Sequence, residues 1–73
     1  MERLSPGIYR TKAGDNAIVR RIGDTEVTGC VKIGNVLFIT LWDPFGYTIR
    51  VTCFANHNEI NKRDYDLVER IKD

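Results

Sequence analysis

Apolar and polar residues alternate with a period of two along most of this chain, which is the pattern of β-strands that bury one face. β-Branched and aromatic residues dominate the alternating segments, and turns rich in glycine, asparagine and proline separate them. Short strands separated in this way are typical of small barrels and sandwiches. The pattern predicts an all-β fold, a small SH3-like barrel of five or six antiparallel strands. The five strands expected from the alternation are residues 7–12, 17–22, 26–33, 36–42 and 47–54.

The last quarter of the chain has a weaker pattern. Residues 55–64 are mostly polar and are expected to form a loop. In residues 64–73, Tyr65, Leu67 and Ile71 fit a strand, although the spacing of the apolar residues also fits a short helix. We favour a closing strand, because an open five-stranded sheet would leave an unpaired edge that has to be covered.

The sequence DPFG at residues 43–46 suits a type I turn followed by a glycine in the left-handed region. Such a loop pairs Asp43 with Tyr47 and so fixes which residues share a face of the sheet. We expect the aliphatic face to be the core, which consists of Leu37, Ile39, Leu41, Ile49, Val51 and Cys53. The opposite face carries Phe38, Thr40, Trp42, Thr48, Arg50 and Thr52.

The turn at residues 34–35 leaves two registers open. A two-residue type II′ turn places Val27 opposite Trp42 and Val31 opposite Phe38, whereas a three-residue loop aligns both valines with the aliphatic core. In the first register the fourth strand is covered on both faces, which requires barrel curvature, a packed terminal segment or a second subunit. We favour a structural role for the two aromatic residues. Trp42 is then expected to be partly buried, beneath a terminal segment or across a homodimer seam.

The 73 residues are expected to form a single domain, close to the lower size limit for independent folding. The net charge of +1 gives no overall attraction to nucleic acid or to a membrane, and no apolar run is long enough to span a bilayer. The N-terminal residues lack a secretory signal pattern. Cys30 and Cys53 stand in no paired motif, which fits a reducing, cytoplasmic setting.

Candidate catalytic groups are few. His57 is the single histidine of the sequence, so a four-ligand zinc set with histidine and cysteine spacing is not present. Both cysteines lie in predicted strands, where an inert buried thiol is the common case. Asp64 and Asp66 form a carboxylate pair that is more typical of a solvated strand end or a helix cap, and no glycine-rich phosphate loop is present. We therefore expect no enzymatic activity, no cofactor and no metal site.

Aromatic and basic residues cluster around the turn at residues 43–46 and form the first candidate binding surface. It comprises Trp42, Phe45, Tyr47 and Arg50. Exposed aromatic and arginine side chains are frequent anchors of protein interfaces, which need about 800 Å² per partner. This group predicts a protein-binding surface, with core packing of Phe45 against the closing strand as the alternative.

The second candidate surface is basic. The first predicted hairpin carries Arg10, Lys12, Arg20 and Arg21. Beside Trp42, this hairpin would hold single-stranded nucleic acid through phosphate contacts and base stacking. A solvated hairpin is the favoured interpretation, because dedicated nucleic-acid domains are usually far more basic than this chain.

Four segments resemble a group of short phage-encoded β proteins: GIYRTKAGDNAIVRRIG, VTGCVKIG, LWDPFGY and DYDLVERI, in that order. Members of that group share a G-x-Y-R-T-R-x-G-x-x-A-x-V start, a hydrophobic-x-G strand, W-x-x-x-G and a D-x-D-L-V ending. This chain departs from the pattern in VTCFA and the asparagine-rich loop that follows it. The resemblance implies a small barrel of phage or prophage origin and implies no catalytic residue.

These observations predict a non-enzymatic phage or prophage accessory protein in the cytoplasm of a bacterial host. It would bind and modulate or inhibit a host macromolecule of the defence or transcription machinery, with a host protein as the expected partner. The alternatives are a small barrel that binds single-stranded nucleic acid and a sponge that sequesters a nucleotide between subunits. A homodimer is compatible with each of them, and no membrane association is expected.

Overall fold

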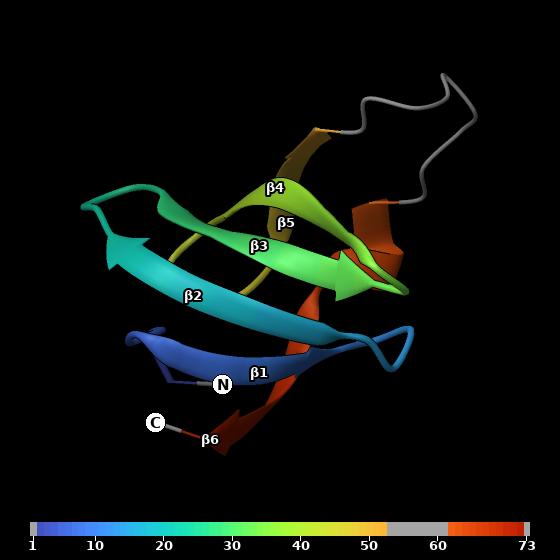
Figure 1. Ribbon diagram of the computed structural model, residues 1–73. Coiled ribbons are helices and arrows are strands. Elements are labelled where there is room, and N and C mark those ends of the chain that lie inside the picture. The colour runs from blue at the N-terminus through green and yellow to red at the C-terminus, as the bar shows by residue number, and fades with distance from the viewer. Residues whose placement is uncertain (1, 53–61, 73) are drawn as a thin grey trace.

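A single six-stranded antiparallel sheet makes up the fold in the computed structural model, which describes residues 2–52 and 62–72 (Figure 1). The spatial order of the strands is β5-β4-β3-β2-β1-β6, and a 3₁₀ turn, η1, precedes the last strand. This confirms the predicted all-β, small-barrel type of fold and the closing strand near the C-terminus. The elements are β1 (Gly7–Thr11), β2 (Asn16–Ile22), β3 (Val27–Ile33), β4 (Val36–Trp42), β5 (Thr48–Thr52), η1 (Lys62–Tyr65) and β6 (Leu67–Lys72).

The two edges of the sheet meet at the start of β5 and β6. The amide of Leu67 donates to the carbonyl oxygen of Gly46 at 2.9 Å, and the amide of Thr48 donates to Asp66 Oδ1 at 2.7 Å. Arg63 donates to the carbonyl oxygen of Thr48 at 2.6 Å. These bonds join the first and last strands of the order at one end, so the sheet curls towards a barrel.

The turn at residues 34–35 has two residues, and it sets the register of β3 and β4. Val27 lies opposite Trp42 and Val31 lies opposite Phe38. Gly34 has a φ of 61°, while no described non-glycine residue has a positive φ, as a type II′ turn requires. Of the two registers that the sequence left open, the type II′ register is therefore correct.

Trp42 is the centre of the core and is 0% exposed. Its ring packs over Gly29, where an added Cβ would stand 3.0 Å from Cζ3 of the indole and would also collide with the carbonyl oxygen of Ile18. Its indole nitrogen donates to the carbonyl oxygen of Tyr65 at 2.9 Å. The segment that leads into β6 thus covers Trp42, which is one of the two arrangements expected from the sequence. The rest of the buried cluster is Leu4, Tyr9, Ala17, Val19, Val27, Val31 and Leu67.

The predicted aliphatic core is wrong, because that face of β4 points away from the cluster around Trp42. Ile39 is 52% exposed and Ile49 is 42% exposed, while Leu41 and Val51 are only partly buried. Burying the indole removes on the order of 200 Å² from water, and its N–H also gains a partner, so the aromatic face turns inward. Cys53, also assigned to this core, lies outside the described residues.

A β-bulge shifts the register of β4 and β5 away from the one that the turn at residues 43–46 predicts. The expected pairing of Asp43 with Tyr47 is confirmed by a 2.8 Å bond from the Asp43 amide to the Tyr47 carbonyl oxygen. An unbroken ladder from that pairing would place Leu41 opposite Ile49. The register shifts between Trp42 and Leu41, so that Leu41 lies opposite Arg50. The extra residue is a bulge of the kind that increases local twist, which the curled sheet requires here.

Candidate functional site

The turn between β4 and β5 is held rigidly by its own hydrogen bonds. Oδ1 of Asp43 accepts from the amides of Phe45 at 2.8 Å and Tyr47 at 3.0 Å. The Gly46 amide donates to the Asp43 carbonyl oxygen at 3.1 Å, and Gly46 has a φ of 96°, which favours glycine. The carbonyl oxygen of Pro44 accepts a bond from the N-terminal segment. The turn therefore presents its side chains from a fixed backbone.

Two large aromatic side chains project from this turn into solvent. Phe45 is 50% exposed and Tyr47 is 57% exposed. Phe45 therefore does not pack into the core, which was the alternative that the sequence left open for it. Exposed aromatic residues on a rigid turn form an unusual surface for a chain whose single tryptophan is fully buried.

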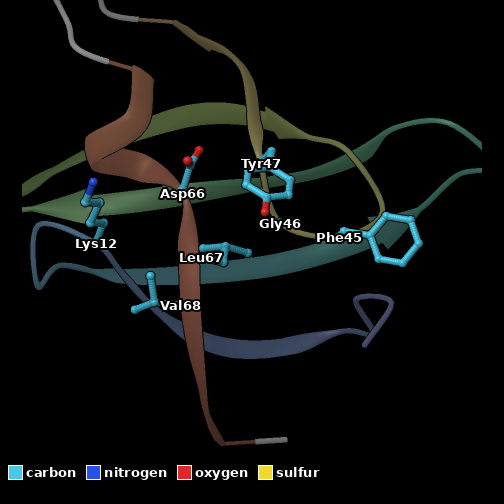
Figure 2. A pocket seen from close by; sticks show the side chains of 7 residues that line it. All are labelled: Lys12, Phe45, Gly46, Tyr47, Asp66, Leu67 and Val68. Atoms are coloured by element: carbon cyan, nitrogen blue, oxygen red, sulfur yellow. The ribbon is translucent and has the colours of Figure 1, made fainter. Parts of the chain in front are cut away.

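A hollow of about 370 Å³ lies beside the two aromatic residues, between the turn and the start of β6 (Figure 2). In Figure 2, Phe45 and Lys12 stand at opposite ends of the hollow, with the start of β6 between them. Its lining comes from three separate parts of the chain, because the closure of the sheet brings the turns together. The lining residues are Lys12, Phe45, Gly46, Tyr47, Asp66, Leu67 and Val68.

The two charged residues that line this hollow differ in whether another group already compensates their charge. Asp66 accepts from the Thr48 amide and lies 3.5 Å from Arg63, so its charge is already compensated. Lys12 is exposed, and no ion pair holds it within the described residues. The hollow is therefore an apolar and aromatic site with one available cation at its end. It suits an apolar side chain with an anionic group nearby.

A second hollow of about 360 Å³ shares Val68 with the first and is lined also by Arg70 and Ser5. Arg70 stacks over the Tyr9 ring at 5.3 Å from its centroid and donates to Tyr9 Oη at 2.7 Å. Burial alone would raise the pKa of Tyr9, but the hydrogen bonds from Ser5 and Arg70 and the charge of Arg70 outweigh it. The net pKa of Tyr9 lies below its usual 10.0. The interactions of Arg70 therefore hold the N-terminal segment in place.

The predicted site residues divide into separate groups in the structure. Phe45, Tyr47 and Lys12 come together at the first hollow. Trp42 is buried and belongs to the core, so it offers no exposed anchor. The remaining arginines, Arg10, Arg20, Arg21 and Arg50, are exposed on the strands of the sheet, away from the hollow.

Sequence reasoning did not identify Val68, which is 53% exposed and lines both hollows. The signal was present in the alternation of β6, since a buried Leu67 places the next side chain on the opposite face. Within the described residues, no group of three histidine, cysteine, aspartate or glutamate side chains is placed to hold a metal. His57 lies outside those residues.

No protein-family model matches the chain, and neither a curated protein nor a solved structure matches it. In residues 2–52 and 62–72, no helix has the length and apolar character needed to cross a membrane. The function therefore has to be argued from the surfaces themselves.

Proposed function

We propose that this protein is a non-enzymatic binding protein that engages a partner protein through its turn surface, defined as Phe45, Tyr47, Val68 and Lys12. The observation that carries the proposal is the half-exposure of Phe45 and Tyr47 on a turn fixed by Asp43. Aromatic residues dominate the hot spots of protein interfaces. A backbone that is rigid before binding also lowers the entropy lost on association.

The chemistry of the turn surface indicates what the partner would present. The hollow between Phe45 and Val68 accepts an aliphatic or aromatic side chain, and Lys12 favours a carboxylate beside it. A standard interface covers about 800 Å² on each partner, which is a substantial share of the 5081 Å² exposed by the described fold. The turn surface would be the centre of such an interface.

The resemblance to short phage-encoded β proteins supports a biological setting for the proposal. In that setting the partner is a host protein, and binding modulates or inhibits it in the bacterial cytoplasm. The alternative of single-stranded nucleic-acid binding is weaker, because Trp42 is buried and Arg10 is paired with Glu69 at 3.2 Å. Base stacking would need an exposed aromatic face on the basic hairpin.

The test begins with affinity capture from a bacterial lysate on the immobilised protein, followed by identification of the partner and titration with the purified components. Phe45→Ala combined with Tyr47→Ala is the test variant. Ile39→Glu is the matched control, because it changes an equally exposed apolar residue on another face.

The proposal expects the wild type and Ile39→Glu to bind the purified partner equally and the double variant to bind at least about tenfold more weakly, which is 1.4 kcal/mol. Equal binding by the double variant, or the absence of a partner that binds in purified form, would contradict it. Nuclease-sensitive nucleic acid as the only captured material would favour the alternative function.

A further inference from the structure

Strands β1 to β5 contain no aspartate and no glutamate. All carboxylates of the described residues lie in turns, in the terminal segments, in η1, or in and just before β6. The five strands nevertheless carry basic side chains, namely Arg10, Arg20, Arg21, Lys32 and Arg50. The surface of this part of the sheet is therefore cationic, although the whole chain has a net charge of only +1.

An aliphatic row crosses the outer face of the sheet, the face directed away from Trp42. By register, Ile8 lies beside Ile18, Ile18 beside Cys30, and Cys30 beside Ile39. Ile39 is 52% exposed and the two other isoleucines are partly exposed, whereas Cys30, a free thiol, is buried at 8% exposure. Leu37, two residues from Ile39 on the same face, is 53% exposed. In β4, this is the face that the sequence pattern assigned to the core.

Two pairs of cations flank the aliphatic row. On one side, Arg10 and Lys32 stand two residues along their strands from the row. On the other side, Arg21 lies opposite Thr28 and Arg50 lies opposite Leu41. Two residues along a strand correspond to about 7 Å, so each pair is that far from the row.

These cations are largely available for a partner. All four are exposed, and within the described residues only Arg10 is held in an ion pair, with Glu69. We call the four cations and the aliphatic row between them the outer-face strip.

The dimensions of the strip match those of a helix. Four neighbouring strands span about 14 Å, because adjacent strands are about 4.8 Å apart. A helix is about 10–12 Å wide and rises 1.5 Å per residue, so about ten residues would cross the row. The flanks of such a helix would then lie over the two pairs of cations.

We propose that the outer-face strip docks an acidic amphipathic protein segment, with aliphatic side chains on the row and carboxylates towards Arg21, Arg50, Lys32 and Arg10. Nucleic acid is the poorer fit, because the strip contains no aromatic residue for base stacking. A second copy of the chain is also a poor fit, because the two strips would bring like charges together. The inference is independent of the turn surface and of its partner.

The experiment uses synthetic helical peptides of about 14 residues as probes. The acidic probe has leucine at one-face spacing with glutamate on both flanks, and its control has lysine in place of every glutamate. Binding is followed by fluorescence anisotropy, and the contacted residues are located from backbone amide NMR shifts. Ile39→Glu and a double variant, Arg21→Glu with Arg50→Glu, test the strip. Ile71→Glu and Arg3→Glu are controls that make the same kinds of change at exposed residues outside both the strip and the turn surface.

The proposal expects the acidic probe to bind, the basic probe not to bind, and added salt to weaken binding. It also expects shifts at Ile18, Cys30 and Ile39. Ile39→Glu and the double arginine variant should each lower affinity about tenfold or more, with the two controls unchanged. Circular dichroism should show that every variant is folded.

Three results would overturn the proposal. The first is equal binding of both probes, or none up to millimolar concentration. The second is tighter binding of an oligothymidylate than of the acidic probe, with loss in Ile39→Glu, which would assign the strip to nucleic acid. The third is a wild-type dimer in sedimentation equilibrium that Ile39→Glu dissociates, which would assign it to a second copy. Because Ile39→Glu is the control of the turn-surface test and a test variant here, either proposal can fail alone.

Discussion

The indole nitrogen of Trp42 donates to the carbonyl oxygen of Tyr65, 2.9 Å away and 23 residues later in the chain. This bond connects β4 to η1 and satisfies the one polar atom of a side chain that is otherwise fully enclosed. It also determines which face of β4 is inside. The aliphatic residues of that strand are left on the surface as a consequence.

Gly29→Ala tests the space that the sheet leaves for Trp42. The added Cβ would collide with the Ile18 carbonyl oxygen and the indole ring, so we expect a loss of about 3 kcal/mol in the free energy of unfolding, or failure to fold. Gly14→Ala is the control. A Cβ there meets nothing within 4 Å, and only its positive φ is costly, at about 1–2 kcal/mol. Urea denaturation measures the free energy of unfolding of both variants. Similar losses in the two would contradict the packing of Trp42 over Gly29.

Alanine substitutions distinguish the two faces of the sheet. Ile39→Ala should lower the free energy of unfolding by less than about 1 kcal/mol, because the side chain is half exposed. Val31→Ala removes two methyl groups from a fully buried site and should cost about 2 kcal/mol. Chemical denaturation checks the order. A larger loss for Ile39→Ala would place the core on the aliphatic face.

Within β4 the sequence determined which residues share a face of the sheet, but not which face is buried, and the bulge exchanges the faces of Arg50 and Val51 in β5. Period-two alternation groups Ile39 with Leu41 and Thr40 with Trp42, and either group satisfies the pattern. The decision depends on Gly29 and Tyr65, which meet the indole only after β3 and η1 are in place. These are contacts between distant segments, which local alternation does not encode.

One part of the candidate site was predictable from the local sequence, and the other part depends on contacts between distant segments. The turn chemistry of residues 43–46 indicated the exposed position of Phe45, since proline and glycine at these positions fix a tight loop. Val68 and the hollow itself depend on the bond between Leu67 and Gly46, which closes one end of the sheet. The β-bulge in β5 likewise arises from curvature of the whole sheet.

Thr48→Val should stabilise the protein by about 1 kcal/mol. The Thr48 hydroxyl is buried and has no hydrogen-bond partner in the described part of the chain. Replacing it with a methyl group breaks no hydrogen bond there and removes the free-energy cost of burying an unpaired polar group. Thr40→Val is the matched control, because the Thr40 hydroxyl donates to the Phe38 carbonyl oxygen at 3.0 Å. It should be neutral or destabilising. Thermal unfolding compares them, and a destabilised Thr48→Val would indicate a partner for that hydroxyl.

Arg70→Met should raise the pKa of Tyr9. The variant removes a hydrogen bond and a positive charge that favour the phenolate, while burial, which raises the pKa, and the hydrogen bonds with Ser5, which lower it, remain. In the wild type, the folded-state pKa lies below the unfolded value of 10.0. Ionisation of Tyr9 therefore contributes to the free energy of unfolding, and this contribution is complete at pH values above 10.0. It is lost as the pH falls through the folded-state pKa.

Carbon-13 NMR of labelled tyrosine ring carbons resolves Tyr9 from the other tyrosines in this titration. Arg50→Met removes an equal charge from the outer face of the sheet and should leave the pKa of Tyr9 unchanged. An unchanged pKa in Arg70→Met as well would show that Arg70 does not control the phenolate.

Solvent paramagnetic relaxation in NMR tests the central claim most directly, because it compares both faces of β4 in one sample. With a soluble gadolinium chelate, we expect strong relaxation of the Ile39 and Leu37 methyl groups and of the Phe45 ring. The Trp42 indole N–H should be protected, at every protein concentration in the monomer range. Strong relaxation of the indole together with protected Ile39 and Leu37 methyl groups would contradict the account, since the aliphatic face would then be the core.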